Sequence, residues 1–336
     1  MSKDGAVPAR ASSVPSVSGG AEDLFSENVP LNGSAPTDLD PLQVYLTRRK
    51  EEVDRILQSY LPRASCEPAL IHEALRYSLF AGGKRLRPIL CIAACEAVGG
   101  NAQTALPFAA AIELMHTYSL VHDDLPAMDD DTYRRGKLTS HKMFGESTAI
   151  LAGDALLTST FTMLAEKGLG GSISPRRVLS VILELGAACG STGMVGGQLL
   201  DIESQGGKEV NLEKLVEIHS LKTGALFRAS IRIGGILGSA GPKKLTALTR
   251  FGEKAGLAFQ IADDILDVEG DEALMGKSVG QDQSTDKWTY PGFLGLERAK
   301  KEAKTHVQNA VAALEKFGPE ADPLRQIAAY MVDRKK

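Results

Sequence analysis

The sequence predicts a single all-α domain, and three observations support this prediction. Apolar residues recur with the period of an α-helix along most of the 336 residues, and glycine or proline separates most of these periodic segments. The apolar content is mainly Ala, Leu, Ile and Val, and aromatic residues make up only 5% of the chain, which favours helices over sandwiches or barrels. No segment has the pattern typical of a β-strand, and no repeat of fixed period is present.

The predicted helices follow one another from residue 39 onward. Residues 1–38 are rich in Ser, Ala, Gly and Pro and lack apolar periodicity, so we expect a disordered N-terminal arm followed by one domain over 39–336. The first helix begins after Asp40, a residue suited to the N-cap, and carries apolar residues at helical spacing from Leu42 to Leu61. The segment 192–203 is a further candidate. The other predicted helices span 67–81, 87–98, 104–123, 147–167, 174–190, 211–223, 225–237, 243–268, 293–316 and 322–334.

Composition excludes several classes of function. The formal net charge of -4 argues against a general nucleic-acid binder, because affinity for phosphate backbones needs a basic surface. We expect no membrane span and a cytoplasmic location, because no run of eighteen apolar residues and no signal peptide is present. An organellar targeting role for the N-terminal arm is the alternative. The four cysteines form no CxxC pair, so buried free thiols in a reducing compartment are expected.

Two acidic clusters are the first candidates for a functional site. In the helix predicted over 243–268, Asp263 and Asp267 lie one turn apart on one face, with Asp264 beside them. Like charges at this spacing cost an isolated helix about 0.2–0.5 kcal/mol per pair, so a hard divalent cation is the simplest counter-charge. A solvated helix face is the alternative. The second cluster, Asp123 with Asp124 and Asp129, ends another predicted helix, so the two clusters predict facing walls of one cavity that holds several metal ions.

Basic residues accompany both clusters. The segment 82–88, Gly-Gly-Lys-Arg-Leu-Arg-Pro, places three cations beside paired glycines whose backbone can approach an anion closely, which suits a diphosphate. A helix linker with solvated charges is the alternative. Arg134 and Arg135 follow the first acidic cluster, where salt bridges between the two blocks are the competing interpretation. His116 lies two helical turns before Asp123 and therefore on the same face, which favours donation to a diphosphate over a structural role.

Taken together and in this order, these motifs resemble the trans-isoprenyl diphosphate synthases from about residue 40 to the C-terminus. The likeness is greatest to bacterial-type farnesyl diphosphate synthases, followed by plastid-type geranylgeranyl diphosphate synthases. The residues that carry it are Gly82 to Pro88, Asp123 to Asp129 with Arg134-Arg135-Gly136, Gly153 to Leu156, Lys222-Thr223-Gly224, Gln260 to Asp267, Gly276-Lys277 and Lys287 to Pro291.

The resemblance implies a helical bundle around a deep central cavity. It also implies a transferase that condenses isopentenyl diphosphate with an allylic diphosphate, and a homodimer. Magnesium is the implied cofactor, with three ions when substrate is bound and manganese as a substitute. The implied metal ligands are Asp123, Asp124, Asp129, Asp263, Asp264 and Asp267. The implied catalytic residues are Asp123, Asp124, Asp129, Asp263 and Lys222.

Two substrate sites follow from the same resemblance. The first binds the allylic diphosphate and comprises Arg134, Lys222, Thr223, Gln260, Lys277 and Lys287. The second binds isopentenyl diphosphate without a metal and comprises Lys84, Arg87, His116 and Arg135.

Product length is expected to depend on Tyr118 and Ser119. Tyr118 lies five residues before Asp123, about 7.5 Å along the helix, where a bulky aromatic side chain closes the pocket in this family. A C15 product, farnesyl diphosphate, is therefore expected, with the C20 product and a non-catalytic partner subunit as alternatives. Tyr118 as a core side chain without this role also stays open. A class I terpene cyclase would need no second diphosphate site, which argues against that class.

Overall fold

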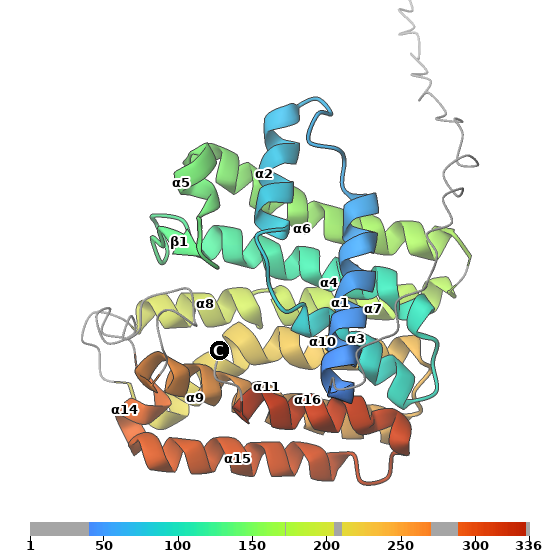
Figure 1. Ribbon diagram of the computed structural model, residues 1–336, viewed down its shortest axis with the longest axis vertical. Coiled ribbons are helices and arrows are strands. Elements are labelled where there is room, and N and C mark those ends of the chain that lie inside the picture. The colour runs from blue at the N-terminus through green and yellow to red at the C-terminus, as the bar shows by residue number, and fades with distance from the viewer. Residues whose placement is uncertain (1–39, 172, 205–209, 270–287, 334–336) are drawn as a thin grey trace, which may run out of the picture. The chain divides into compact units, whose positions relative to one another are not determined.

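The computed structural model describes residues 40–171, 173–204, 210–269 and 288–333, and helices dominate these ranges (Figure 1). The chain divides into two units, Met1–Leu39 and Asp40–Lys336, and all described residues belong to the second. The predicted arm and two predicted site residues, Lys277 and Lys287, lie outside the described residues. Within the described ranges the predicted all-α fold is confirmed.

Most helices begin close to the predicted positions. Asp40 caps the first helix, because its side chain accepts a hydrogen bond from the backbone N–H of Leu42 at 3.1 Å. The candidate segment 192–203 is helical over Met194–Glu203. The helices are α1 (Pro41–Tyr60), α2 (Ala69–Leu79), α3 (Leu86–Ala97), α4 (Ala102–Asp123), α5 (Ser140–Phe144), α6 (Glu146–Leu169), α7 (Pro175–Cys189), α8 (Met194–Glu203), α9 (Leu212–His219), η1 (Ser220–Gly224), α10 (Ala225–Leu237), α11 (Pro242–Glu269), α14 (Tyr290–Leu294), α15 (Leu296–Ala313), η2 (Pro319–Ala321) and α16 (Asp322–Asp333).

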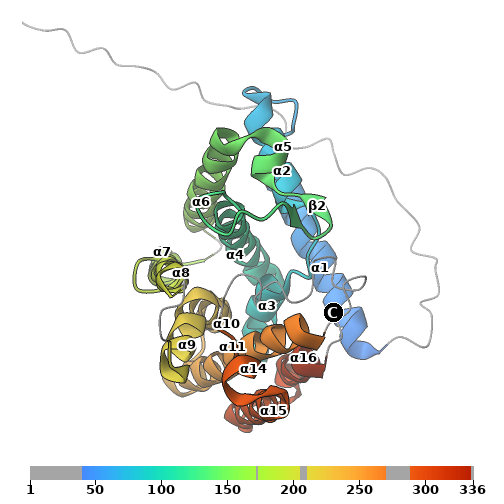
Figure 2. The ribbon, with the colours of Figure 1, turned by 90° about the vertical axis from the view of Figure 1, so that its left-hand side faces the viewer.

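Helix α4 is the centre of the larger apolar core. It buries residues on every face, as expected for a helix that carries apolar side chains all round. Its neighbours α1, α3 and α6 pack against it, and α10 packs in turn against α3, α7 and α11. In Figure 1, α4, α6 and α15 run across the view, whereas α1 runs vertically in front of α4. In the turned view of Figure 2, the short strand β2 (Lys137–Leu138) and helices α8, α9 and α14 are on the side that faces the viewer.

A short hairpin between α4 and α5 was not predicted. Strands β1 (Tyr133–Arg134) and β2 (Lys137–Leu138) pair antiparallel, and both residues of the connecting turn, Arg135 and Gly136, have positive φ angles of 55° and 75°. This is the pattern of a type I′ turn, which matches the twist of paired strands. Two-residue strands are too short for apolar alternation to reveal them, so only the glycine marked the turn in the sequence.

Two helix boundaries differ from the prediction. The segment predicted as a helix over 211–223 ends its α-helical part at His219 and continues as a π-helical turn, η1, which leads directly into α10. The segment predicted over 293–316 begins earlier, at Tyr290, and breaks at Gly295, whose φ of 74° lies in the left-handed region. Glycine allows that break without a steric cost, and α15 starts immediately after it.

The four cysteines are all free thiols, of which Cys66 is exposed and the other three are buried. The expectation of buried thiols is therefore wrong for Cys66. Two helical stretches, Glu146–Leu169 and Pro175–Glu203, are long and apolar enough to cross a membrane by length and composition alone. Core helices of soluble proteins pass the same test, and α6 packs against α2 and α4 here.

Candidate active site

The two acidic clusters line one cavity of about 350 Å³, which we call the acidic cavity. Asp123 ends α4 and Asp129 lies in the following loop, while Asp263 and Asp264 lie near the end of α11. The structure therefore brings together two carboxylate groups that are far apart in the sequence. Other predicted site residues that line this cavity are Arg87, His116, Ser119, Arg134, Lys222, Thr223 and Gln260.

A second cavity, of about 510 Å³, lies next to the first, and we call it the basic cavity. All four residues predicted for isopentenyl diphosphate line it: Lys84, Arg87, His116 and Arg135. Arg87 and His116 line both cavities, so the two spaces share a wall. Such an arrangement can hold two anionic groups side by side.

Electrostatics in the acidic cavity favours a bound cation. Burial raises the pKa of Asp123 to about 6; Lys222 opposes this shift and Asp129 adds to it. Within the described residues, no three acidic, histidine or cysteine side chains stand close enough to form a complete metal site. Magnesium sites in enzymes commonly take only one or two carboxylates and complete their shell with substrate phosphate oxygens and water. The hard oxygen donors on both walls fit that kind of ion.

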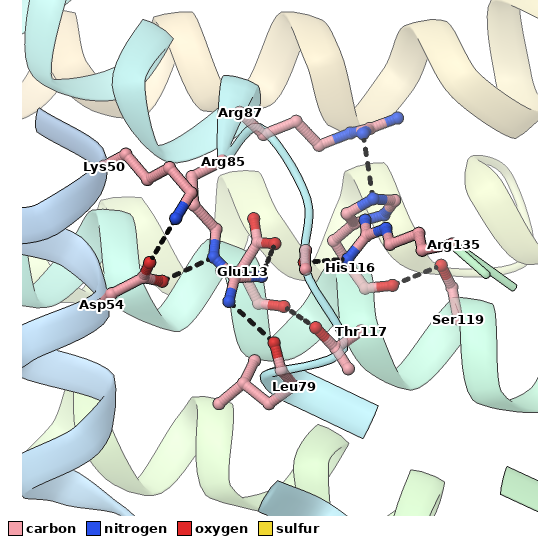
Figure 3. Close-up of polar contacts among 11 residues, drawn as sticks. Lys50, Asp54, Leu79, Arg85, Arg87, Glu113, His116, Thr117, Ser119 and Arg135 are labelled. Atoms are coloured by element: carbon pink, nitrogen blue, oxygen red, sulfur yellow. Dashed lines mark hydrogen bonds and ion pairs between the residues drawn. The ribbon is translucent and has the colours of Figure 1, made fainter. Parts of the chain in front are cut away.

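Electrostatics at the shared wall favours a bound anion. The side chains of Arg87 and His116 are 3.2 Å apart between Nη1 and Nε2 (Figure 3). Burial, and then the charges of Arg87 and Arg135, hold the pKa of His116 well below its ordinary value, so the ring is neutral and its Nε2 accepts from Arg87. Burial also lowers the pKa of Arg87 and of Arg135. A diphosphate would relieve the repulsion between these cations.

Two of the six aspartates predicted as metal ligands are not among the residues that line the acidic cavity. Asp124 is 3% exposed, and its Oδ1 accepts a hydrogen bond from Nε of Arg134 at 2.5 Å. Asp267 is 2% exposed and lies one turn beyond Asp263 on α11. Asp264 does line the cavity, where it accepts a hydrogen bond from the backbone N–H of Tyr290 at 2.9 Å. Asp124 is thus placed to orient Arg134.

Lys222 has a partner that the sequence did not reveal. Its ammonium group lies 2.6 Å from Oδ2 of Asp201, on the last turn of α8. Burial would lower the pKa of Lys222, but Asp201, Asp129 and Asp123 outweigh that effect and raise it. The lysine is therefore a cation that interacts with Asp201 on α8 and with Asp123 and Asp129 on the other side of the cavity. In the sequence, only the position of a charged residue directly after apolar residues could have indicated that Asp201 has a role in the site.

The π-helical turn η1 and a glycine place Lys222 and Thr223. A π-helical turn adds one residue to a helix and commonly occurs at functional sites. Helix α8 packs against η1, and a Cβ atom at Gly197 would lie 2.2 Å from the backbone nitrogen of Lys222. Only glycine allows so close an approach. The backbone of α8 therefore packs directly against the turn and holds Lys222 in place.

Arg85 is a structural cation rather than a third substrate-binding cation. Its side chain is 2% exposed and bonds to Glu113 at 2.8 Å, to Asp54 at 2.7 Å and to the carbonyl oxygen of Leu79 at 2.7 Å (Figure 3). This network connects Arg85 to α1, to α4 and to the last residue of α2. It fixes the loop that carries Lys84 and leads into α3, where Arg87 lies, so neighbouring cations in one motif have different roles.

The two residues predicted to control product length are placed differently. Ser119 lines the acidic cavity, whereas Tyr118 does not line it. The Tyr118 ring makes an edge contact with His122, at 5.3 Å between ring centroids, and packs against the core built around α4. Tyr118 directly precedes Ser119 on α4, and successive side chains of a helix point about 100° apart.

Comparisons with known proteins agree with this geometry. The model of the family "Polyprenyl synthetase" matches residues 68–330. The chain is 46% identical over 295 residues to the farnesyl diphosphate synthase of Micrococcus luteus, covering 88% of this chain and 100% of that protein. It is 45% identical over 293 residues to the geranylgeranyl diphosphate synthase of Cyanophora paradoxa, covering 87% and 96%.

Solved structures show the same likeness. An FPP/GFPP synthase from Zymomonas mobilis, solved as an apo structure, superposes with a TM-score of 0.77 at 38% identity, covering 87% of this chain and 98% of that one. The geranylgeranyl pyrophosphate synthetase of Pyrococcus horikoshii superposes with a TM-score of 0.79 at 33% identity, with the same coverage of 87% and 98%.

Proposed function

Because this chain belongs to the polyprenyl synthetase family and is a trans-prenyl diphosphate synthase, we propose that it makes farnesyl diphosphate from isopentenyl diphosphate and the allylic dimethylallyl and geranyl diphosphates. The observation that carries the proposal is the pair of cavities joined at Arg87 and His116. The acidic cavity is lined by carboxylates together with Lys222, and the basic cavity is lined mainly by cations. They therefore suit two different diphosphates, one bound through metal ions and one bound without a metal.

Asp123, Asp129, Asp263 and Asp264 would hold magnesium ions together with the allylic diphosphate. When bound, such ions neutralise the diphosphate as it leaves, acting as Lewis acids and as a template. Lys222 adds a fixed positive charge at the same place, and Arg134, held by Asp124, adds a second. Both favour the separation of charge when the allylic carbon–oxygen bond breaks.

The basic cavity would bind isopentenyl diphosphate through Lys84, Arg87, His116 and Arg135 without a metal. Its alkene then attacks the allylic carbon, and a proton is lost to an oxygen of the departed diphosphate. Thr223 and Gln260 would present their oxygens toward the positive carbon. No nucleophilic side chain is needed, because charge stabilisation and positioning supply the catalysis.

The proposal of a C15 product rests on Tyr118, a bulky residue that directly precedes the cavity-lining Ser119 on α4 and would limit chain growth. Geranylgeranyl diphosphate, the C20 product, is the second candidate, because the related proteins bear both names. We further propose a homodimer that acts in the cytoplasm, without a membrane span and without nucleic-acid partners.

The test is to incubate the purified protein with magnesium, isopentenyl diphosphate and each of the C5, C10 and C15 allylic diphosphates, and then to size the products. Elongation of the C5 and C10 substrates that stops at C15 supports the farnesyl assignment. Elongation of the C15 substrate to C20 favours the alternative. If no substrate is elongated, the synthase assignment itself is wrong.

A further inference from the structure

Gln198 on α8 is a buried amide that none of the proposed steps uses. It is 6% exposed and lines the acidic cavity. Within the described part of the chain, neither its Nε2 nor its Oε1 has a hydrogen-bond partner. A buried amide without partners destabilises a fold, so its presence in a cavity indicates a partner that arrives with the ligand.

The position of Gln198 along α8 identifies the part of the ligand it would meet. Met194, Gln198 and Asp201 share one face of α8, because they are four and three residues apart. Asp201, about 4.5 Å further along the helix, pairs with Lys222 where the diphosphate is proposed to bind. Met194, about 6 Å before Gln198, lines the cavity as an apolar side chain. Gln198 therefore stands where a charged head group would join a hydrocarbon chain.

The backbone of Gln198 is fixed in that position. The preceding residue, Gly197, is packed against the backbone of Lys222 so closely that any side chain would collide with it. Helix α8 also donates from the N–H of Gly197 to the carbonyl oxygen of Gly193 at 2.8 Å, which continues the helix through this contact. A preorganised amide costs little further ordering when the ligand binds.

We propose that Gln198 contacts the allylic substrate at the bond that breaks, with Nε2 donating to a diphosphate oxygen and Oε1 turned toward the adjacent carbon. This proposal rests on the proposed synthase function. When the carbon–oxygen bond breaks, its electron pair leaves with the diphosphate. Negative charge then grows on the oxygen that the amide N–H reaches, and positive charge grows on the carbon that the amide oxygen faces. Both contacts strengthen as the bond breaks, so the amide favours the transition state over the bound substrate.

The test compares Gln198→Met with the wild-type protein in steady-state elongation of geranyl diphosphate. Methionine keeps the length of the side chain and removes both polar atoms. We expect kcat to fall about 10- to 100-fold, as for the loss of a hydrogen bond to a developing charge, while the KM for isopentenyl diphosphate stays within about twofold. Gln308→Met, at an exposed position on α15, is the matched control and should leave both constants unchanged.

The melting temperature separates this role from a structural one. Because the amide has no hydrogen-bond partner among the described residues, Gln198→Met should keep or raise the melting temperature measured without substrate, whereas a structural amide would lower it. Gln198→Leu, a second apolar replacement, serves if the methionine variant does not fold. A kcat within about twofold of the wild type in a folded variant overturns the role of Gln198 but leaves the synthase function standing. A wild-type protein that elongates no allylic diphosphate overturns both.

Discussion

The buried ion pair between Arg85 and Glu113 should be required both for stability and for the isopentenyl site. Their side chains are 2% and 3% exposed and lie 2.8 Å apart. Removing one partner of a buried ion pair costs about 3–5 kcal/mol, because the other charge stays buried. In Glu113→Gln the amide oxygen still accepts one hydrogen bond, and Asp54 still balances part of the charge from 2.7 Å. We therefore expect the free energy of unfolding to fall by about 2–3 kcal/mol.

Urea unfolding followed by far-ultraviolet circular dichroism, without substrate, measures this change. The matched control is Glu217→Gln, because Glu217 pairs with Lys214 at 2.9 Å but their side chains are 52% and 40% exposed. A surface pair of this kind contributes about 0.3–0.5 kcal/mol. Equal losses in the two variants would refute the assignment of the Arg85 network as a buried structural element.

The same variant should change substrate binding selectively. Arg85 lies between Lys84, in the loop before α3, and Arg87, in the first turn of α3, so a loosened network displaces the cations of the basic cavity. We expect the KM for isopentenyl diphosphate to rise more than that for geranyl diphosphate, because the described residues predicted to bind geranyl diphosphate lie on β1, η1 and α11. Initial rates with each substrate varied in turn measure this difference, and parallel increases would contradict it.

Three further predictions concern the acidic cavity. Asp123→Ala and Asp263→Ala should each abolish turnover without unfolding the protein. Near-normal product formation by either variant would show that the proposed assignment of that aspartate as a metal ligand is wrong. Tyr118→Ala should lengthen the product seen by chromatography, and unchanged C15 output would show that another side chain limits chain growth. Gly197→Ala should cost about 1–3 kcal/mol and lower turnover, because its Cβ would collide with the π-helical turn. The control is Gly186→Ala on α7, where the added Cβ would meet no atom within 4 Å, so this variant should be more stable than the wild type by up to about 1 kcal/mol in the same urea assay. A larger loss of stability in Gly186→Ala than in Gly197→Ala would contradict this account.

Local sequence signals predicted the helices because long helices repeat their apolar spacing many times. Helix α11, predicted over 243–268, spans Pro242–Glu269 in the structure, and Asp40 caps α1 as expected. The hairpin at Tyr133–Leu138 was missed because each strand has only two residues. Its turn depends on a positive φ at Arg135, a conformation that a non-glycine residue adopts only when its surroundings hold it there.

The charged residues that line the acidic cavity were predicted, but Asp201, the partner of Lys222, was not. Asp123 and Asp263 signalled a counter-charge by repulsion, and the structure places both on one cavity. Charge alone did not distinguish Arg85 from Arg87, two residues apart in one motif, because the difference lies in the buried acids that only the fold brings to Arg85. Gln198 gave no signal at all, since a neutral amide in an apolar helix has no electrostatic cost until its burial is known.

The π-helical turn at Ser220–Gly224 also determines how α9 and α10 are phased relative to one another. Each residue rotates a helix by about 100°, so the single extra residue of the turn sets which faces of the two flanking helices point into the cavity. Deleting Ser220 would restore regular hydrogen bonding and would keep Lys222 and Thr223 in the chain. It would still rotate the apolar face of α10 away from α3 and α11, against which it packs. Chain length in this short segment is therefore as strictly constrained as the identity of Lys222, and a family member with a deletion there would have to repack its core.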